Sequence, residues 1–90
     1  MNTTDITPGR VYTNGNGRFR VVTGIRNVGS WIDIDYADAY RNTKGIMRRV
    51  APTASLNHSG IHSFSGWCAS DATPGDAAEV LSVLNIKETQ

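Results

Sequence analysis

Two histidines and one cysteine are the residues with the most specific chemistry in this chain. His58 and His62 are four residues apart, and Cys68 follows six residues after His62. Imidazole and thiolate groups bind zinc, but a structural zinc site normally uses four such ligands. One ligand is therefore missing, and the intervening Ser59 and Gly60 disfavour the helix that would bring the two imidazoles together. We expect no metal site and no cofactor.

Nucleophilic catalysis is the second chemistry that these residues suggest. A cysteine near a histidine is a possible thiol nucleophile. The neighbours of Cys68, Trp67 and Ala69, favour a buried and unreactive thiol instead. Ser63, next to His62, lacks the glycine-flanked pattern of a nucleophile elbow. The sequence therefore predicts a protein that is not an enzyme.

Closely spaced carboxylates are the third candidate. Asp33 and Asp35 are two residues apart, and Asp38 follows. On a strand, this spacing places the first two carboxylates on one face, about 7 Å apart. Arginines on the neighbouring strand are expected to neutralise them, in preference to a metal ion.

Arginine dominates the middle of the chain. Residues 10–49 carry seven arginines and one lysine against three aspartates, a net charge of +5, whereas the whole chain carries +1. Arginine is suited to bidentate and stacked contacts. Because alternate residues of a strand point to opposite faces, Arg48 and Arg49 cannot both belong to one flat surface. The candidate binding residues are Arg18, Arg20, Arg26, Trp31, Asp33, Asp35, Arg48 and Arg49.

A β-hairpin is the element that must position most of these side chains. Apolar and polar residues alternate along 18–26 and again along 31–36, the pattern of strands with one buried and one exposed face. We expect residues 27–30 to connect them as a loop. This register places Arg26 opposite Trp31 as a cation–π pair. It also gives two further cross-strand pairs, Gly24 with Asp33 and Val22 with Asp35.

Turn signals and alternation predict the neighbouring elements. Strands are expected over 10–13 and 45–50, and the first leads into a tight turn at Asn14–Gly17. Residues 37–44 are interpreted as a loop or a short helical turn. Residues 52–60 are interpreted as a polar loop.

The last third of the chain is expected to hold one strand and one helix. Residues 61–67 are interpreted as a strand with a bulge near Gly66. Thr73 is a suitable helix cap, and Pro74 suits the first helical position. The helix is expected to bury an apolar stripe of Ala77, Val80, Leu81 and Leu84 and to end at Asn85.

About five short strands and a C-terminal helix predict a mainly β fold, either a small antiparallel barrel or a strongly bent sheet. Gly9-Arg-Val-Tyr12 and Arg20-Val-Val-Thr-Gly-Ile25 resemble the opening hairpin of SH3-like, KOW-like and Tudor-type barrels. The resemblance covers about the first third of the chain and implies a fold, with no ligand-binding residue. The predicted core comprises Val11, Phe19, Val21, Ile25, Ile32, Ile34, Ile46, Phe64, Val80, Leu81 and Leu84, and Trp67 is expected in the core rather than as a ligand platform.

Ninety residues predict a single domain, 1–90, with flexible ends at 1–7 and 87–90. No apolar run approaches the length that spans a bilayer, so no membrane contact is expected. The first residues have neither the basic nor the apolar region of a secretory signal. With a single cysteine, these features predict a cytoplasmic protein.

The residues therefore favour a non-catalytic binding module. Its size and its preference for arginine over lysine resemble those of accessory or inhibitor proteins of phages and mobile elements. Such a protein would act by binding a host protein or a nucleoprotein complex. The alternative is a nucleic-acid-binding barrel that uses its arginine-rich face, with Tyr12, Trp31 or Tyr40 for stacking. Asp33 and Asp35 favour the first interpretation, because they neutralise arginines that a phosphate backbone would need.

Overall fold

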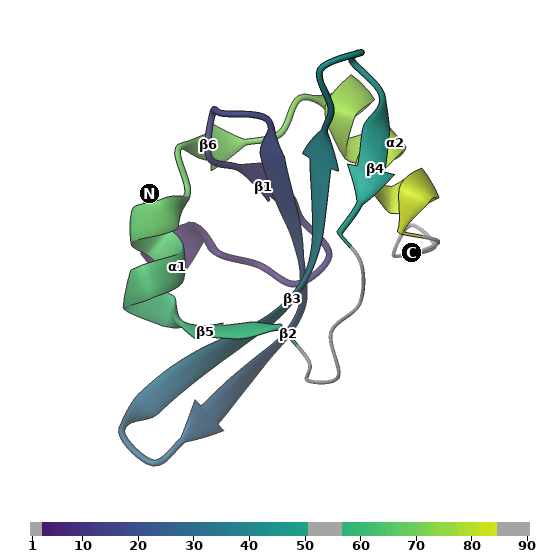
Figure 1. The fold of residues 1–90 in the computed structure, drawn as a ribbon. Helices are drawn as coiled ribbons and strands as arrows, with labels where there is room; N and C mark the ends of the chain where they lie inside the picture. The colour runs from purple at the N-terminus through teal and green to yellow at the C-terminus, as the bar shows by residue number, and fades with distance from the viewer. Residues whose placement is uncertain (1–2, 51–56, 85–90) are drawn as a thin grey trace.

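Five strands precede the first α-helix of this chain, and a sixth strand lies between the first and the second α-helix (Figure 1). The computed structural model describes residues 3–50 and 57–84. Its strands are β1 (Val11–Thr13), β2 (Arg18–Val28), β3 (Trp31–Arg41), β4 (Met47–Arg49), β5 (His58–Gly60) and β6 (Ser70–Asp71). Its helices are the 3-10 helix η1 (Thr3–Asp5) and the α-helices α1 (Ile61–Trp67) and α2 (Pro74–Val83).

The six strands form one antiparallel sheet in the order β4-β3-β2-β1-β6, and β5 also pairs with β3. The two strands at the ends of this order, β4 and β6, do not pair with each other, so the described strands form an open sheet. The predicted mainly β, antiparallel architecture is confirmed. Its closure into an SH3-like or KOW-like barrel is not confirmed.

Strands β2 and β3 are the longest, with 11 residues each, and they pair along their whole length. The register shifts between Val22 and Gly24, so Thr23 is an extra residue that forms a β-bulge. A bulge changes the face to which the following residues point. Val22 and Ile25 therefore share one face of the sheet, while Val21 points to the other.

Each face of the sheet is covered by one helix, and the two helices lie on opposite sides of the strands (Figure 1). We call the two clusters of buried side chains the α1 core and the α2 core. The α1 core contains Ile6, Tyr12, Val22, Ile34, Phe64 and Cys68. The α2 core contains Val11, Phe19, Val21, Ala39, Met47 and Val80.

Six of the eleven predicted core residues are buried and two are half-buried, but three are exposed. Ile25 and Ile32 are each 37% exposed, and Ile46 is 49% exposed. The bulge moves Ile25 away from the face of Val21, and on β4 the next residue, Met47, takes the buried position. Those predicted correctly are Val11, Phe19, Val21, Ile34, Phe64 and Val80, with Leu81 and Leu84 half-buried against the α2 core.

The segment 61–67 is helix α1, so the predicted strand there is wrong. Ile61, Phe64 and Cys68 recur at helical spacing, which points all three toward the same core. The irregular alternation arose from this helical period. Phe64 is fully buried and meets the Tyr12 ring edge-on, with 5.9 Å between the ring centroids. Half-buried Trp67 packs against the same core.

Helix α2 begins as predicted. The Thr73 hydroxyl oxygen accepts a hydrogen bond from the Asp76 backbone N–H at 3.2 Å, and Pro74 occupies the first turn. Arg41, at the end of β3, donates hydrogen bonds of 2.6 Å to the carboxylates of Asp76 and Glu79. These contacts join α2 to the sheet.

Two segments predicted to lack strand structure contain strands. Residues 37–41 continue β3, because Ala39 is buried in the α2 core and Arg18 donates a 3.0 Å hydrogen bond to Asp38. His58–Gly60 forms β5 within the predicted polar loop.

The chain ends are described only in part. The predicted helix end at Asn85 and the tail 87–90 lie outside the described residues. The segment 1–7 contains η1 and the buried Ile6 in its described part. Neither described α-helix is long and apolar enough to span a membrane.

Ile34 is fully buried, whereas Ile32, two residues earlier on the same face of β3, is partly exposed. Ile34→Ala should lower the free energy of unfolding by about 2–4 kcal/mol, because the lost methylene groups leave a cavity in a packed core. The matched control Ile32→Ala should cost less than about 1 kcal/mol. Urea denaturation measures both losses, and equal losses would contradict this assignment of burial.

Candidate binding site at the end of the β2–β3 hairpin

The hairpin closes with a two-residue turn at Gly29 and Ser30. Gly29 has a φ of +63°, which a glycine adopts at low cost at the first position of a tight turn. Val28 therefore lies opposite Trp31. The predicted loop over 27–30 is too long by two residues, so its register is wrong. The predicted pairs Arg26–Trp31, Gly24–Asp33 and Val22–Asp35 do not form; the observed pairs include Arg26–Asp33, Gly24–Asp35 and Val22–Tyr36.

Arg26 binds two aspartates instead of an aromatic ring. Its Nε donates to Asp35 Oδ2 at 2.8 Å, and its Nη2 donates to Asp35 Oδ1 and Asp33 Oδ2 at 2.9 Å. From β5, His58 places Nδ1 3.2 Å from Asp33 Oδ2. The predicted neutralisation of the aspartates by a cross-strand arginine is confirmed. We call Arg26, Asp33, Asp35 and His58 the charge cluster.

Arg26 and Asp35 each stabilise the charged form of the other. The hydrogen bond from Arg26 lowers the pKa of Asp35 from its ordinary value of 3.8, and the same bond raises the pKa of Arg26. The aspartate side chains are 11% (Asp33) and 20% (Asp35) exposed, whereas that of Arg26 is 53% exposed. The arginine therefore covers both carboxylates and favours the charged form of Asp35.

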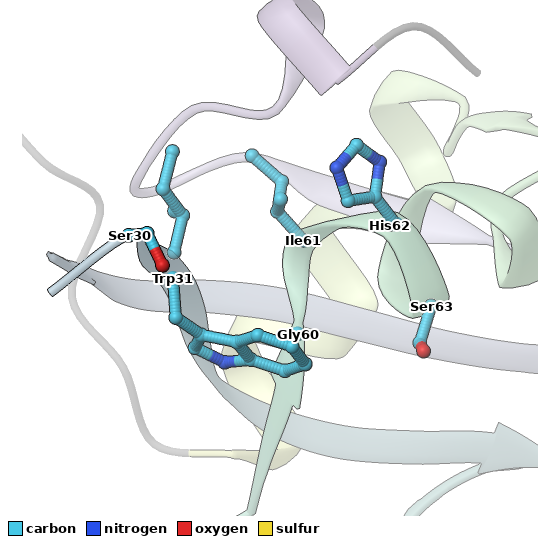
Figure 2. A pocket seen from close by; sticks show the side chains of 7 residues that line it. Ser30, Trp31, Gly60, Ile61, His62 and Ser63 are labelled. Atoms are coloured by element: carbon cyan, nitrogen blue, oxygen red, sulfur yellow. The ribbon is translucent and has the colours of Figure 1, made fainter. Parts of the chain in front are cut away.

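Trp31 lies over a glycine of the neighbouring strand. A Cβ atom at Gly60 would be only 2.7 Å from Cζ2 of the indole, so only glycine leaves room for the ring. The indole also lines two hollows of the surface. One hollow, of about 130 Å³, lies beside the start of α1 and is shown in Figure 2. The other is more open and contains residues of the charge cluster. The first is lined by Ser30, Trp31, Ile32, Gly60, Ile61, His62 and Ser63.

Apolar side chains are exposed around the end of the hairpin, which projects beyond both helices (Figure 1). Trp31 is 60% exposed and Val28 is 54% exposed. Val28 and Trp31 lie on the face of the charge cluster, and Ile25 and Ile32 lie on the opposite face. Exposed apolar side chains that gather at one end of a molecule are typical of interaction sites. We call Ile25, Val28, Trp31 and Ile32 the hairpin surface.

Arg18 and Arg20 lie on the face of β2 that α1 covers, nearer the body of the protein. Arg18 pairs with Asp38. The Arg20 guanidinium carbon is 4.2 Å from the Tyr36 ring centroid and 4.1 Å from that of Trp67, so the arginine forms cation–π contacts with both rings. Arg20 therefore helps to hold α1 on the sheet.

Arg48 and Arg49 lie on β4 and are exposed, and neither forms an ion pair with another described residue. Arg48 lies opposite Tyr40, which in turn lies opposite Arg18. These three side chains therefore share one face across three strands, while Arg49 points to the other. The eight predicted binding residues thus fall into separate groups, and only Arg26, Trp31, Asp33 and Asp35 lie at the hairpin end.

The histidines and the cysteine are dispersed. His58 is in β5, His62 is in α1, and Cys68 follows α1. Among residues 3–50 and 57–84, no group of three His, Cys, Asp or Glu side chains is placed to hold a metal ion. Cys68 is buried, and burial raises its pKa to about 11, so the thiol stays protonated at neutral pH. That the chain is not an enzyme and takes no cofactor stays a prediction.

Sequence reasoning missed two residues of this site, His58 and Gly60. Both belong to a strand of only three residues, which gives too little sequence for an alternating pattern. Their roles depend on pairing with β3, a segment distant in the chain. No local signal in the sequence marks that pairing.

No known protein family matches this chain, and neither a curated protein nor a solved structure matches it. The distinguishing features of the site are the exposed hairpin surface and the ion-paired charge cluster beside it.

Gly60→Ala should displace the Trp31 indole, because the added methyl group would lie 2.7 Å from the ring. The Trp31 indole N–H signal in an NMR spectrum should shift, and the variant should be less stable than the parent. Gly66→Ala is the matched control, because a Cβ at this α1 position meets no atom within 4 Å. An unchanged Trp31 signal in Gly60→Ala would show that the ring does not rest on Gly60.

Arg26→Gln should raise the pKa of Asp35 toward 3.8, because the hydrogen bond that lowers it is lost. Since folding lowers this pKa, the ion pair stabilises the fold fully above about pH 3.8, and the stabilisation is lost as the pH falls through the lowered value. NMR titration of the side-chain carboxyl carbon measures the shift. Asp71, which pairs with Arg10 instead, is the internal control. An Asp35 titration that is identical in both proteins would contradict the pairing.

Proposed function

We propose that this protein is a non-catalytic binding module that docks on a protein partner through the hairpin surface. The observation that carries this proposal is the exposure of Trp31 and Val28 on a hairpin that projects beyond both helices. Burial of such side chains lowers the free energy, and these side chains remain exposed when the chain folds alone. Tryptophan is also among the residues that contribute most to binding at protein interfaces.

The charge cluster supports a protein partner at this end of the molecule. Arg26 is already paired with two aspartates, so its charge is compensated. The cluster sets two aspartates against this one arginine. A phosphate backbone approaching Trp31 would therefore meet Asp33 and Asp35 and gain little from counterion release.

We further propose that the partner is a host protein or a nucleoprotein complex, with this chain acting as an accessory or inhibitor protein of a phage or mobile element in the cytoplasm. Small size and the excess of arginine over lysine support this source. Such a protein would inhibit by occupying a surface of its partner and would need no reactive group.

A second candidate function, nucleic-acid binding, is favoured by one separate observation. Exposed Tyr40 lies between Arg18 and Arg48 on one face of three adjacent strands. An aromatic ring flanked by arginines suits a nucleic-acid strand, since bases stack on the ring and phosphates bind the guanidinium groups. Arg18 already pairs with Asp38, which reduces the free positive charge of this surface.

Trp31→Ala should weaken binding of the protein partner by roughly thirtyfold, which corresponds to about 2 kcal/mol for an interface anchor. The free energy of unfolding should change by less than about 1 kcal/mol, because the side chain is largely exposed. Crosslinking with a photoreactive group near Trp31 in a host lysate identifies the partner, and calorimetry with the purified partner measures affinity. Ile46→Ala is the control, because Ile46 is an exposed apolar residue distant from the hairpin surface.

Equal affinity of Trp31→Ala and the parent protein would contradict docking through the hairpin surface. Binding of single-stranded DNA or RNA that is lost in Tyr40→Ala would support the second function instead. In that case Arg48→Gln should also reduce the slope of log affinity against log salt concentration, by roughly one for each lost phosphate contact.

A further inference from the structure

Along the distal half of the hairpin, no strand of residues 3–50 and 57–84 pairs with the outer edge of β2. Strand β1 covers this edge up to Val21, and Val22 exchanges backbone hydrogen bonds with the segment just before β1. Val22 N–H donates to the Arg10 carbonyl at 3.1 Å, and Gly9 N–H donates to the Val22 carbonyl at 2.8 Å. Among the described strands, none pairs with this edge beyond Val22.

The pairing of β2 with β3 determines which backbone groups face outward. In a two-residue hairpin the closing pair, here Val28 and Trp31, is hydrogen-bonded, and hydrogen-bonded pairs alternate with non-hydrogen-bonded pairs along the strands. Asn27 and Ile25 therefore occupy non-hydrogen-bonded pairs. Their N–H and C=O groups point away from β3, toward the unpaired edge.

This edge has few of the features that usually block strand addition. Residues 23–28 contain neither proline nor lysine. Their one charged side chain, Arg26, is turned toward Asp33 and Asp35 on the face of the sheet. The bulge at Thr23 lies at the inner end of the unpaired stretch, so the groups beyond it remain accessible.

We propose that residues 23–28 accept an extended segment of the partner protein as an additional antiparallel strand. This proposal rests on the proposed function and specifies how the partner reaches the hairpin surface. The antiparallel orientation is that of β1, which occupies the earlier part of the same edge. Strand addition of this kind obtains affinity from backbone hydrogen bonds and specificity from alternate side chains.

The neighbouring side chains specify the chemistry of the added segment. A residue opposite Ile25 would point to the face that carries Ile25 and Ile32, so an apolar side chain fits there. A residue opposite Gly24 would point to the face of the charge cluster. A Cβ at Gly24 would be 3.5 Å from Asp35 Oδ2, so a basic group on the added strand would come near this carboxylate, beside its existing partner Arg26.

The two aspartates of the cluster, set against one arginine, also favour a basic residue opposite Gly24. The added segment therefore contains an apolar residue followed, in its own direction, by a lysine or an arginine. Acetylated and amidated Thr-Val-Val-Lys-Thr is such a segment, with its second valine opposite Ile25 and its lysine opposite Gly24.

NMR titration of the protein with this peptide tests the proposal. The amide signals of Ile25 and Asn27 should shift downfield with a saturable dependence on peptide concentration. Asn27→Pro removes one outward N–H and should weaken binding by roughly tenfold, the effect of about one lost hydrogen bond. Asn27→Ala is the matched control and should bind as the parent does. A peptide with glutamate in place of lysine should bind more weakly.

If Asn27→Pro does not fold, Ile25→Lys replaces it as the test variant. Ile25→Lys removes the apolar contact with the peptide and leaves β2–β3 pairing intact, so it should also weaken peptide binding.

Absence of saturable shifts at Ile25 and Asn27 overturns the proposal, as does equal peptide affinity of Asn27→Pro and the parent. Sedimentation of the protein alone tests whether a second copy of this chain occupies the edge instead. A dimer that Asn27→Pro abolishes would overturn the proposal that a partner segment binds there. The proposed function is tested separately with the protein partner. If Trp31→Ala lowers that affinity and Asn27→Pro does not, the hairpin surface stands and strand addition is wrong. If the peptide binds the edge but Trp31→Ala leaves partner affinity unchanged, strand addition stands and docking through the hairpin surface is wrong.

Discussion

The antiparallel pair of β2 and β3 is the constraint on which the rest of the structure depends. The extra residue at Thr23 lies within this pair and divides it into two parts with different surroundings. In the inner part, Val21 and Val22 are consecutive in sequence and are buried on opposite faces, each beneath a different helix. The outer part extends beyond both helices, so its two faces remain accessible.

Arginine serves three different purposes in the sheet, on β2 and β4, and its neighbours decide which. Arg20 has its guanidinium group against the rings of Tyr36 and Trp67, so it contributes to the packing of α1. Arg26 binds two carboxylates at the hairpin end. Arg48 forms no ion pair within the described residues and stays exposed beside Tyr40. A positive charge balance in residues 10–49 therefore does not produce one continuous basic surface.

The parts of the fold set by local rules could be predicted from the sequence. The alternation of β2, the cap at Thr73 and the burial of Ile34 each follow from neighbouring residues. The bulge at Thr23 could not be predicted, because valine at both 21 and 22 fits either register until both cores are known. The spacing of apolar residues in 61–67 fits a bulged strand as well as a helix. Only the burial of Cys68 beside Phe64 distinguishes the two. The pairing of His58 with Asp33 joins residues distant in sequence, for which local patterns carry no information.

The contacts of the candidate site also stabilise the outer part of the hairpin. A two-stranded ribbon alone is only marginally stable in water. Here β5 adds a third strand, Arg26 joins β2 to two aspartates of β3, and Trp31 covers Gly60. The contacts that join the hairpin to β5 are thus also those that position Trp31. Because they form on folding, a segment that adds to this edge would bind a preorganised strand and lose less conformational entropy than one that must order both partners.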